Sequence, residues 1–443
     1  MLSNHISSDH LSDTHCAGKL EAVMQAGGCD LHLHTHYSDG SDSPERLISR
    51  VIDAGLNTIS VTDHDTIDAI ESCEDCLSEL QAQGMKVPSF IPGVEVSADD
   101  VCELHILGYY PNGGIERIAD FLDQQQQTRQ KRNRLLADRL QALGYPVSLE
   151  EMQQIGKGSA GRMQAALLLV KTGCVPSVSE AFEQLLSEGR PAYVERKRAD
   201  AQTVIEAINT TGGAAVLAHP NLYGWCSGES LVSGDLLYHL ERLKKMGLQG
   251  VEAFHGQATL AEQQEISAAA RAVGLLRTAG SDDHGGNKDN TRMYRGCQKW
   301  LDDQELLVVS ALISYKDKNS ACRKYLLGRR SENGKFKGCW EMPGGKVMPG
   351  ESTVEALKRE LYEELAVCAE VGSLQYVIHH DYPGQRVILL CYEAECDHKW
   401  QLRVHDAIGF YTPQEALNLN LLPADIALFK KLRQLPQPFE GVF

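Results

Sequence analysis

Between residue 29 and about residue 280, segments in which every second residue is apolar alternate with segments in which apolar residues recur every three or four positions. Alternate apolar residues predict a strand around Leu31, and Ser43 and Pro44 then predict the start of a helix that ends before Gly55. Further strands are predicted at 58–61, 89–96, 105–109, 214–218, 250–254 and 275–279. Strands that alternate with helices are typical of an α/β protein with a largely parallel sheet.

Most of these predicted strands end in a polar or titratable residue. Active sites of parallel α/β folds gather at the carboxyl ends of the strands, so this pattern indicates a single site. The stretch 115–161 interrupts the alternation because it is mostly helical, with a run of glutamines at 124–127 that we interpret as a solvated helix face. We interpret this stretch as a helical insertion or lid.

The hydrophobic pattern changes near Trp300. A longer strand is predicted at 306–313, followed by a shorter one at 325–327, a glycine-rich turn, a helix and further strands up to Tyr392. A chain of 443 residues also exceeds the size at which one hydrophobic core keeps growing, so two domains are expected.

We place the boundary between these domains at about 300–304. The first domain then covers 29–300 and the second covers 304–443. Residues 1–28 remain as an N-terminal extension, for which a flexible tail and an extra strand are both open.

Composition narrows the class of protein. The chain has 42% hydrophobic and 23% charged residues, as globular proteins do, and a formal net charge of −17 at pH 7. That charge argues against duplex DNA as a partner, because lysine and arginine supply the affinity for its phosphates. No run of about 18 apolar residues predicts a membrane span, and residues 1–28 lack the order of a signal peptide. We therefore expect a cytoplasmic protein with no membrane partner.

The 13 cysteines form no dense framework. Cys73 and Cys76 make one CxxC pair in an acidic, helix-like stretch, without a second pair to complete a zinc site. Reduced thiols are the expected state.

Two histidines lie two residues apart on the first predicted strand. His32 and His34 therefore project from the same face and can hold one divalent metal ion, although such a pair alone could equally be satisfied by hydrogen bonds at a barrel rim. Further ionisable residues at the strand ends change this balance: Asp39, His64, Glu95, His105, His219, Asp282 and His284. Burying so many ionisable groups at adjacent strand ends is costly unless cations compensate them. The sequence therefore predicts a metal centre.

Five motifs carry these residues: DLHLHTHYSDG at 30–40, TDHDT at 62–66, GVEVS at 93–97, LAHP at 217–220 and GSDDHG at 280–285. In this order they resemble the PHP (polymerase and histidinol phosphatase) family over roughly 29–300. The resemblance implies a distorted seven-stranded (βα) barrel with up to three Mn, Fe, Zn or Mg ions. By motif, the metal ligands would be His32, His34, Asp39, His64, Glu95, His105, His219, Asp282 and His284.

Two further segments, GRMQAALLLVKTG at 161–173 and VEAFHG at 251–256, are similar to the stand-alone nucleotide phosphoesterases of this family. Those enzymes release the 3′-phosphate of 3′,5′-bisphosphonucleotides or trim the 5′ ends of short RNA. The resemblance therefore implies small nucleotides or short oligonucleotides as partners. That branch has histidine where Gln164 stands, so an altered substrate side is expected.

Clustered divalent ions can activate a bridging water and clamp phosphoryl oxygens, so no amino-acid nucleophile is required. Arg129, Arg132 and Arg134 are about one helical turn apart and could bind a second phosphate, since guanidinium groups suit that task; the alternative is an exposed basic helix face. His255 would either contact phosphate or only cap a strand.

One acidic helix is predicted in the second domain. Its start is a capping box, Ser352-Thr353-Val354-Glu355, and its apolar residues recur at helical spacing. Three glutamates lie three and four residues apart on another face: Glu360, Glu363 and Glu364. Alone they would be an ordinary solvated face, but Gly345, Glu351 and Arg359 frame them at fixed distances.

This framing resembles the Nudix box, G-x5-E-x7-R-E-U-x-E-E-x-G-U, with Ala366 in place of the last glycine. Over about 304–443 the resemblance implies an α/β/α sandwich with a mixed sheet, in which Mg or Mn binds a diphosphate. It implies metal ligands at Glu360, Glu363 and Glu364, with one of these glutamates also serving as the base, and Arg359 orienting Glu351. Ala366 stands at a helix end where glycine best tolerates positive φ, and we expect the chemistry to survive it.

Outside the box, LLGRR at 326–330, WEMPGGK at 340–346 and LLPADIALFKKL at 421–432 are similar to MutT-like nucleoside triphosphatases. That similarity implies that Asp425 reads the base edge, with Tyr382 and Phe410 as wall residues. An N-cap role for Asp425 on the last helix is the alternative, and both roles can coexist. The substrate would be an 8-oxo-dGTP-like or pyrimidine nucleoside triphosphate, cut to monophosphate and pyrophosphate.

Two metal-binding sets on one chain favour a bifunctional hydrolase. A second hypothesis is sequential cleavage of a 3′-phosphorylated dinucleotide such as coenzyme A, first by the Nudix domain and then by the PHP domain. The non-enzymatic alternative is that one domain senses a nucleotide and regulates the other. The oligomeric state has no indicator in the sequence.

Overall fold

The computed structural model describes residues 9–155, 160–195, 197–287, 305–316, 323–331, 336–397 and 400–434. The chain forms two compact units. Unit 1 comprises Met1–Tyr223, Leu240–Ala258 and Leu275–Lys299, and unit 2 comprises Gly224–His239, Thr259–Gly274 and Trp300–Phe443. Unit 2 therefore includes two segments from within 29–300, and inside it the Val232 amide donates to the Val377 carbonyl at 2.9 Å. The boundary predicted at about 300–304 lies outside the described residues.

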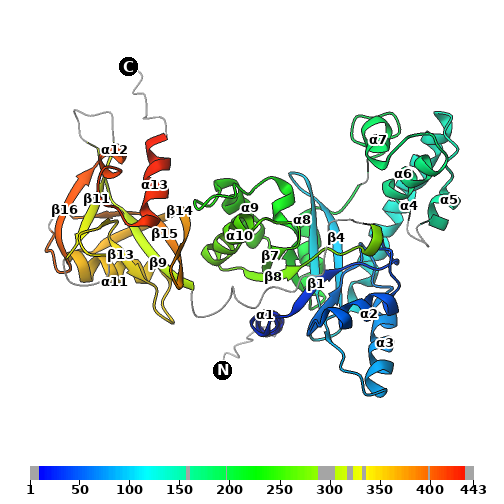
Figure 1. Cartoon of the computed structure of the whole chain (residues 1–443), viewed down its shortest axis with the longest axis horizontal. Helices are drawn as coiled ribbons and strands as arrows, with labels where there is room; N and C mark the ends of the chain where they lie inside the picture. Colours follow the sequence, from blue (N-terminus) through cyan, green and yellow to red (C-terminus); the bar gives the residue numbers. More distant parts are fainter. Residues whose placement is uncertain are drawn as a thin grey trace, which may run out of the picture. The chain divides into compact units, whose positions relative to one another are not determined.

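Two sheets form the centre of unit 1 (Figure 1). The smaller sheet is parallel, with the order β1 (Cys29–Leu33), β2 (Thr58–Val61) and β3 (Ser89–Phe90). The larger sheet has the order β4 (Gly93–Asp99), β5 (Glu103–Tyr109), β6 (Ala214–Leu217), β7 (Gly250–His255) and β8 (Leu276–Gly280). Parallel bridges pair His64 with Glu95 and Leu33 with Asp283, and so join the two sheets at both sides. The result is a distorted α/β barrel, as predicted, but with eight strands among the described residues rather than the seven expected.

The expectation of a largely parallel sheet is wrong around β5. This strand runs antiparallel to β4 and to β6, whereas β6, β7 and β8 are parallel. The short turn between Asp99 and Glu103 is the physical reason, because a parallel crossover needs about a dozen residues or more.

Within the N-terminal extension, the described residues form a helix rather than a strand; residues 1–8 lie outside the described part of the chain. Helix α1 spans Asp9–Ala26 and packs against β6 and β8. Its buried side chains are Cys16, Leu20 and Met24, which recur every four residues along one face.

Helices also continue beyond the predicted insertion 115–161. They are η1 (Ile115–Ile118), α4 (Ala119–Ala142), α5 (Leu149–Ile155), α6 (Arg162–Lys171), α7 (Val178–Ala181) and the π-helical turn η2 (Phe182–Leu186). Helices α4 to α7 and the turn η2 share one hydrophobic core that includes Leu140, Leu169 and Leu186. The apolar run of α6 packs into this local core rather than onto the barrel, which is why the insertion extends further than the sequence pattern indicated.

The remaining helices before residue 288 are α2 (Pro44–Ala54), α3 (Ile70–Ala82), α8 (Ala201–Thr210), α9 (Gly234–Lys245) and α10 (Leu260–Val273), with the 3-10 turns η3 (Pro220–Tyr223) and η4 (Gly285–Asn287); of these, α10 belongs to unit 2. Helix α2 begins and ends as predicted: the Ser43 side chain accepts from the Arg46 amide, and Gly55 adopts φ 72° at the C-terminal end. These caps explain why the helix boundaries were readable from the sequence.

Unit 2 contains two sheets and the predicted acidic helix. The mixed sheet has the order β13 (Gly344–Lys346), β9 (Glu305–Leu312), β15 (Gln385–Cys396) and β14 (Ala369–Tyr382), in which only the β9–β15 pair is parallel. The antiparallel sheet contains β10 (Ser314–Lys316), β11 (Arg323–Arg330), β12 (Trp340–Glu341) and β16 (His405–Tyr411). The helices are α11 (Thr353–Leu365), α12 (Pro413–Ala416) and α13 (Pro423–Gln434). Leu327, Leu428 and Phe429 lie in the core between the antiparallel sheet and α13.

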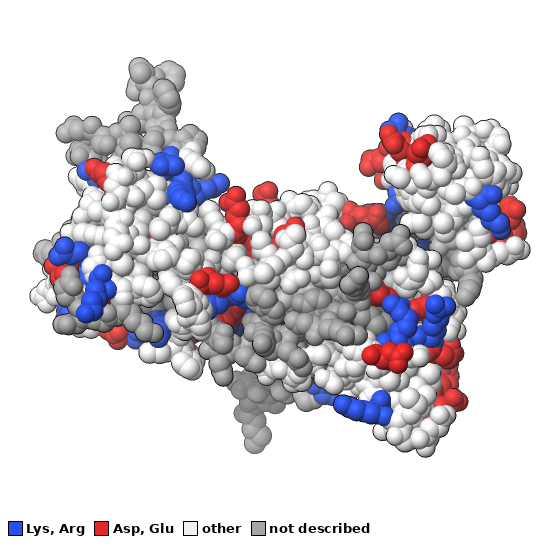
Figure 2. All heavy atoms as spheres, viewed as in Figure 1, with Lys and Arg blue, Asp and Glu red and all other residues white. Residues whose placement is uncertain are grey.

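Charged side chains are distributed in small groups on the face drawn in Figure 2. Lysine and arginine groups on that face are separated by neutral and acidic ones. Within the part of the chain that the structure describes, no helix has the length and apolar character needed to cross a membrane. The absence of a broad basic surface on this face agrees with the net charge of −17.

Candidate active sites

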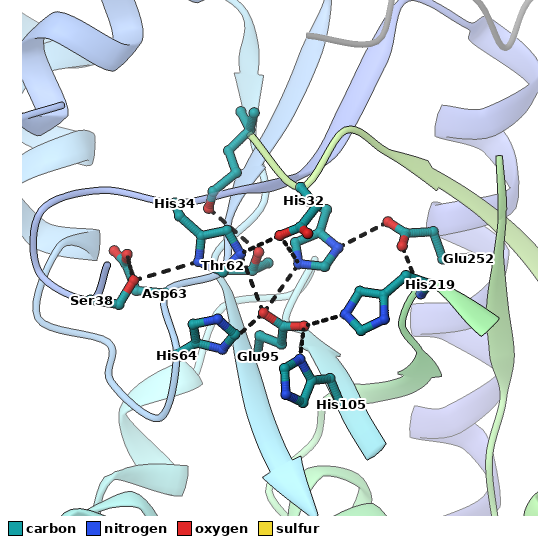
Figure 3. Close-up of polar contacts among 12 residues, drawn as sticks. His32, His34, Ser38, Thr62, Asp63, His64, Glu95, His105, His219 and Glu252 are labelled. Atoms are coloured by element: carbon teal, nitrogen blue, oxygen red, sulfur yellow. Dashed lines mark hydrogen bonds and ion pairs between the residues drawn. The ribbon is translucent and has the colours of Figure 1, made fainter. Parts of the chain in front are cut away.

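The residues predicted as metal ligands in unit 1 lie on barrel strands or directly after them. His32 is on β1, Glu95 on β4 and His105 on β5, while the others follow a strand: His34, Asp39, His64, His219, Asp282 and His284. Figure 3 shows several of their side chains pointing toward one another. Three groups bring ligand atoms within 4.8 Å: His34, Asp39, His64 and His284; His32, His34, Glu95 and Asp282; and His64, Glu95 and His105.

Glu95 lies at the middle of this cluster and is fully buried. Its Oε2 is 3.2 Å from His32 Nε2, 3.3 Å from His34 Nε2 and 3.0 Å from His64 Nδ1. Its Oε1 is 2.8 Å from His105 Nδ1 and 3.1 Å from His219 Nε2. One carboxylate therefore contacts imidazoles from five places in the chain.

Two aspartates extend the cluster. Asp282 Oδ1 lies 3.2 Å from His34 Nε2 and 3.5 Å from His284 Nδ1. Asp39 Oδ1 lies 3.1 Å from His284 Nε2, and its Oδ2 lies 3.6 Å from His64 Nε2. The structure thus brings all nine predicted side chains together, while their role as ligands stays a prediction.

Four buried atoms test whether a divalent cation fits. His32 Nε2, His34 Nε2, His64 Nδ1 and Glu95 Oε2 make no hydrogen bond, and the three nitrogens lie 3.0–3.3 Å from Glu95 Oε2. Atoms that share one ion at about 2.0–2.2 Å lie at about this distance from each other. Imidazole and carboxylate are also the donors that suit Mn, Fe and Zn, so these residues fit the expected ions.

The electrostatics of the cluster favour positive charge. Burial lowers the pKa of His34, but the neighbouring carboxylates of Asp282 and Glu95 outweigh burial and raise this pKa to about 9. Burial raises the pKa of Glu95, yet the charges of His64 and His32 outweigh burial and hold it well below its usual range. A bound cation would therefore meet carboxylates that are already ionised.

Strained backbone also marks this site. His219, Asp282 and Asp65 adopt φ values of 29°, 56° and 55°, which non-glycine residues rarely do. Such strain persists only where surrounding contacts hold it, and it clusters at functional sites.

Sequence reasoning missed two buried carboxylates behind the histidines. Asp63 accepts from the Thr35 amide at 2.8 Å and from Ser38 Oγ, which itself lies 3.5 Å from His34 Nδ1. Glu252 Oε1 lies 3.0 Å from His32 Nδ1. Both stand inside quoted motifs, TDHDT and VEAFHG, but their positions did not distinguish them from ordinary strand residues.

A polar pocket of about 530 Å³ adjoins His64. Arg129 and Arg134 line it, together with amide side chains of α4 such as Gln126 and Gln130. Arg129 Nη1 is 3.7 Å from Asp65 Oδ2.

Other predicted substrate-side residues lie away from this pocket. Arg132 and Gln164 are buried and are not among its lining residues. His255 is fully buried, with Nε2 4.0 Å from Asp282 Oδ2. His255 therefore faces the metal cluster, and a phosphate contact stays a prediction.

The acidic helix α11 of unit 2 has the predicted start and framing. Ser352 and Glu355 form the complete capping box. Arg359 donates to both oxygens of Glu351, at 3.1 and 2.8 Å, to Glu360 at 2.8 Å and to Glu363 at 3.3 Å. One guanidinium thus connects Glu351 with two of the framed glutamates, Glu360 and Glu363.

Glu364 lies in a different environment from the other box glutamates. It is buried and accepts from the Gly344 amide at 3.0 Å, whereas the Glu363 side chain is 55% exposed. Glu364 forms one candidate metal-binding group with Glu341 and His405, and His405 Nε2 lies 3.1 Å from Glu341 Oε1. Burial and the nearby charge of Glu341 raise the pKa of Glu364 to about 8.

The structure therefore adds Glu341 and His405 beside the predicted ligand Glu364. Glu341 belongs to the quoted WEMPGGK segment, but His405 had no sequence signal. Gly328 makes room for His405, because a Cβ there would lie 2.6 Å from His405 Cδ2.

A pocket of about 770 Å³ opens beside this group. Glu360, Glu364, Tyr382 and Asp425 line it, and Asp425 is buried. Burial and the charge of Glu341 raise the pKa of Asp425 well above its usual range.

Phe410 does not line this pocket, because its ring lies against Tyr315 and Trp400, so its expected role as a wall residue is wrong. Phe336 lines it instead, 5.3 Å from the Tyr382 ring. Ala366 adopts φ 58° and its amide donates to the Tyr362 carbonyl at 3.0 Å. Ala366 therefore takes the left-handed conformation that glycine usually adopts at the end of a helix.

Comparison with known families matches both parts of the chain. The PHP domain model matches residues 30–196, and the NUDIX domain model matches residues 306–432. Both families are metal-dependent, and each matched range contains residues of the candidate metal-binding groups.

Three characterised relatives illustrate the match. The 5′-3′ exoribonuclease Rnm of Escherichia coli (strain K12) is 32% identical over 259 residues, which cover 58% of this chain and 84% of the relative. The 3′,5′-nucleoside bisphosphate phosphatase of Chromobacterium violaceum is 28% identical over 260 residues, which cover 58% of this chain and 86% of the relative. The CTP pyrophosphohydrolase of Escherichia coli (strain K12) is 39% identical over 115 residues, which cover 25% of this chain and 84% of the relative.

Proposed function

Since this chain belongs to the PHP family through its N-terminal part and to the Nudix family through its C-terminal part, we propose that it cleaves two kinds of nucleotide at two separate sites. The PHP site removes the 3′-phosphate of 3′,5′-bisphosphonucleotides or trims short RNA 5′ ends. The Nudix site converts an 8-oxo-dGTP-like or pyrimidine nucleoside triphosphate to monophosphate and pyrophosphate.

The observation that carries the first activity is the buried cluster around Glu95 beside a pocket with two arginines. Divalent cations, when bound there, would polarise phosphoryl oxygens and activate water. The histidines and carboxylates of the cluster hold those cations, and Arg129 and Arg134 bind a second phosphate of the substrate. The exoribonuclease and bisphosphate phosphatase relatives support nucleotides or RNA as the substrate class.

The second activity is supported by the pocket that connects Glu360 and Glu364 with Asp425. The glutamates would hold Mg or Mn against the phosphates, and Arg359 keeps Glu351 and Glu360 oriented. Asp425 lies deep enough to read a base edge, and its raised pKa makes the carboxyl a hydrogen-bond donor there. The CTP pyrophosphohydrolase relative supports a pyrimidine nucleotide.

The test measures release of phosphate from 3′,5′-bisphosphonucleotides, of mononucleotides from short RNA and of pyrophosphate from nucleoside triphosphates, each with Mn²⁺ or Mg²⁺. His34→Ala should abolish phosphate release, and Glu364→Gln should abolish pyrophosphate release, each by more than about 100-fold. Each variant should keep the other activity.

Matched controls separate chemistry from folding. His36→Ala changes a histidine two residues from His34 whose Nδ1 donates to the Asp42 carbonyl at 3.2 Å, and Glu370→Gln changes an exposed carboxylate on β14. Both should behave as wild type. Wild-type protein that is inert toward all these substrates, or a single mutation that abolishes both activities, would refute two independent sites.

A further inference from the structure

Glu252 is a fully buried carboxylate on β7 that the sequence predictions left without a role. Its Oε1 lies 3.0 Å from His32 Nδ1, and its Oε2 accepts from the His219 backbone amide at 2.9 Å (Figure 3). Each oxygen of this carboxylate therefore contacts a different predicted metal ligand, one through its side chain and one through its backbone.

The backbone around Glu252 is shaped to admit it. Gly280 on β8 faces the carboxylate, and a Cβ at this glycine would lie 2.5 Å from Glu252 Oε1 and 2.2 Å from His32 Cβ. No real Cβ tolerates such distances, so the contact between Glu252 and His32 requires glycine at this position.

The bond to His219 falls at a strained point of the chain. His219 adopts φ 29°, outside the regions that non-glycine residues prefer. Backbone strain of this kind persists only where surrounding contacts over-determine it. A buried carboxylate that accepts from the amide of the strained residue is such a contact, because breaking it would leave both groups unsatisfied.

The hydrogen bond at His32 Nδ1 also determines whether His32 Nε2 carries a proton or a free lone pair. Glu252 is an acceptor, so it selects the imidazole form with the proton on Nδ1. The lone pair is then on Nε2, which makes no hydrogen bond and lies 3.2 Å from Glu95 Oε2. That nitrogen points into the predicted metal centre.

We propose that Glu252 is a positioning residue of the PHP metal centre, whose two oxygens fix the tautomer of His32 and the backbone of His219. The proposal rests on the proposed metal-dependent function of this site. Carboxylates behind metal-binding histidines raise the basicity of the ligand and orient its ring, and their loss weakens metal binding by about 10- to 100-fold.

Glu252→Gln is the decisive substitution because it is nearly isosteric. A carboxylate accepts at both oxygens, whereas an amide accepts at one atom and donates at the other. In either orientation, the amide of Gln would turn a donor toward His32 Nδ1–H or toward the His219 N–H. The variant therefore removes one hydrogen bond and adds a clash of two donors without changing the volume of the side chain.

Glu265→Gln is the matched control. Glu265 is also a fully buried glutamate, and it accepts from the backbone amides of Ser227, Gly228 and Ser233. Its substitution reports the general cost of removing a buried carboxylate from this chain.

The experiment measures Mn²⁺ affinity of the full chain by isothermal titration and phosphate release as a function of Mn²⁺ concentration. For Glu252→Gln we expect about 10- to 100-fold weaker Mn²⁺ binding to the PHP site, with phosphate release largely recovered at saturating Mn²⁺. Pyrophosphate release by the Nudix site should match wild type and serves as the internal control for folding. Glu265→Gln should leave the Mn²⁺ dependence of phosphate release unchanged.

Two results would overturn the proposal. One is an unchanged Mn²⁺ affinity in Glu252→Gln, and the other is an equal loss in Glu265→Gln, which would assign the effect to general destabilisation. Failure of the proposed function would look different. In that case, His34→Ala would bind as much Mn²⁺ as wild type, because no Mn²⁺ would bind at the PHP site of either protein.

Discussion

Buried carboxylates are balanced differently in the two sites. Around Glu95, imidazoles contact both oxygens, and the pKa of this carboxyl lies well below its usual range because the charges of His64 and His32 outweigh burial. Glu364 is also buried, but the neighbouring charge of Glu341 adds to the effect of burial, and its pKa rises to about 8. Without a cation, the surroundings therefore favour the ionised form of Glu95 and the protonated form of Glu364.

The first prediction concerns Glu364 in metal-free protein. A carboxyl whose pKa is raised on folding, from an ordinary 4.5 to about 8, binds more protons in the folded state, so stability decreases as pH rises through this window. Glu364→Gln stays neutral, so at pH 9 in the presence of a chelator its free energy of unfolding should exceed that of wild type by on the order of a few kcal/mol. It should therefore melt at a higher temperature than wild type under these conditions. Near pH 4 the two proteins should melt together.

Calorimetry or fluorescence melting of both proteins at pH 4 and pH 9 checks this. Added Mg²⁺ at pH 9 should stabilise wild type more than Glu364→Gln, since the ion replaces the missing positive charge. Identical melting curves at pH 9 in chelator would show that the Glu364 charge carries no cost.

Ala366 gives a second prediction. It adopts φ 58° at the end of α11, a conformation that costs a non-glycine residue about 1–2 kcal/mol. Glycine removes this strain but loses some of the gain through its greater freedom in the unfolded chain, so Ala366→Gly should stabilise the protein by about 0.5–1 kcal/mol. Denaturant unfolding measures the change, and pyrophosphate release should be unaltered. A destabilised Ala366→Gly protein would contradict the strain argument.

Among the secondary-structure elements, the strands position the first site and the helices support it. Strands β1, β4 and β5 carry His32, Glu95 and His105, and the loops after β1, β2, β6 and β8 carry the other predicted ligands. The close approach of β1, β7 and β8 depends on Gly280, where a Cβ would lie 2.2 Å from His32 Cβ. Helix α1 only covers the outside of β6 and β8.

A third prediction contrasts two glycines on these elements. Gly280→Ala should abolish phosphate release, because the added methyl group displaces His32 and Glu252. Gly18→Ala in α1 meets nothing within 4 Å at an exposed helical position and should stabilise the chain by about 0.5–1 kcal/mol. Phosphate assays and denaturant unfolding of both variants check the pair. Full phosphate release by Gly280→Ala would show that the strand contact is not required.

For the whole molecule, charge limits the class of polymer that can bind. The net charge is −17, and basic side chains on the face in Figure 2 occur in small groups. The arginines of the pocket beside His64 provide only local positive charge, enough for one or two phosphates.

A fourth prediction follows for nucleic acids. At physiological salt, a labelled duplex DNA of about 20 base pairs should show no retention in a filter-binding assay, because its affinity depends on many lysine and arginine contacts. Short single-stranded RNA should be cleaved under the same conditions in Mn²⁺. Duplex binding of the same strength as single-stranded binding would contradict this view.

Much of both sites could be predicted from local sequence alone. The His32–His34 spacing places two imidazoles on one face of an extended segment. The capping box predicts where α11 begins, and a separation of four residues places Glu360 and Glu364 on one face of this helix. The antiparallel course of β5 and the helical state of α1 were not predictable in this way. They depend on turn length and on packing partners that a local pattern does not contain.

The sequence by itself determined which side chains share one face of a strand or a helix. These groupings follow from the local repeat of two residues in a strand and 3.6 residues in a helix. Only the tertiary structure decided which distant residues meet: Glu252 with His32, and His405 with Glu341 and Glu364. It also decided that Arg132 is buried while Arg129 and Arg134 line a pocket. Such contacts join residues that are up to 220 positions apart, and only the packing of strands against each other brings them within hydrogen-bonding distance.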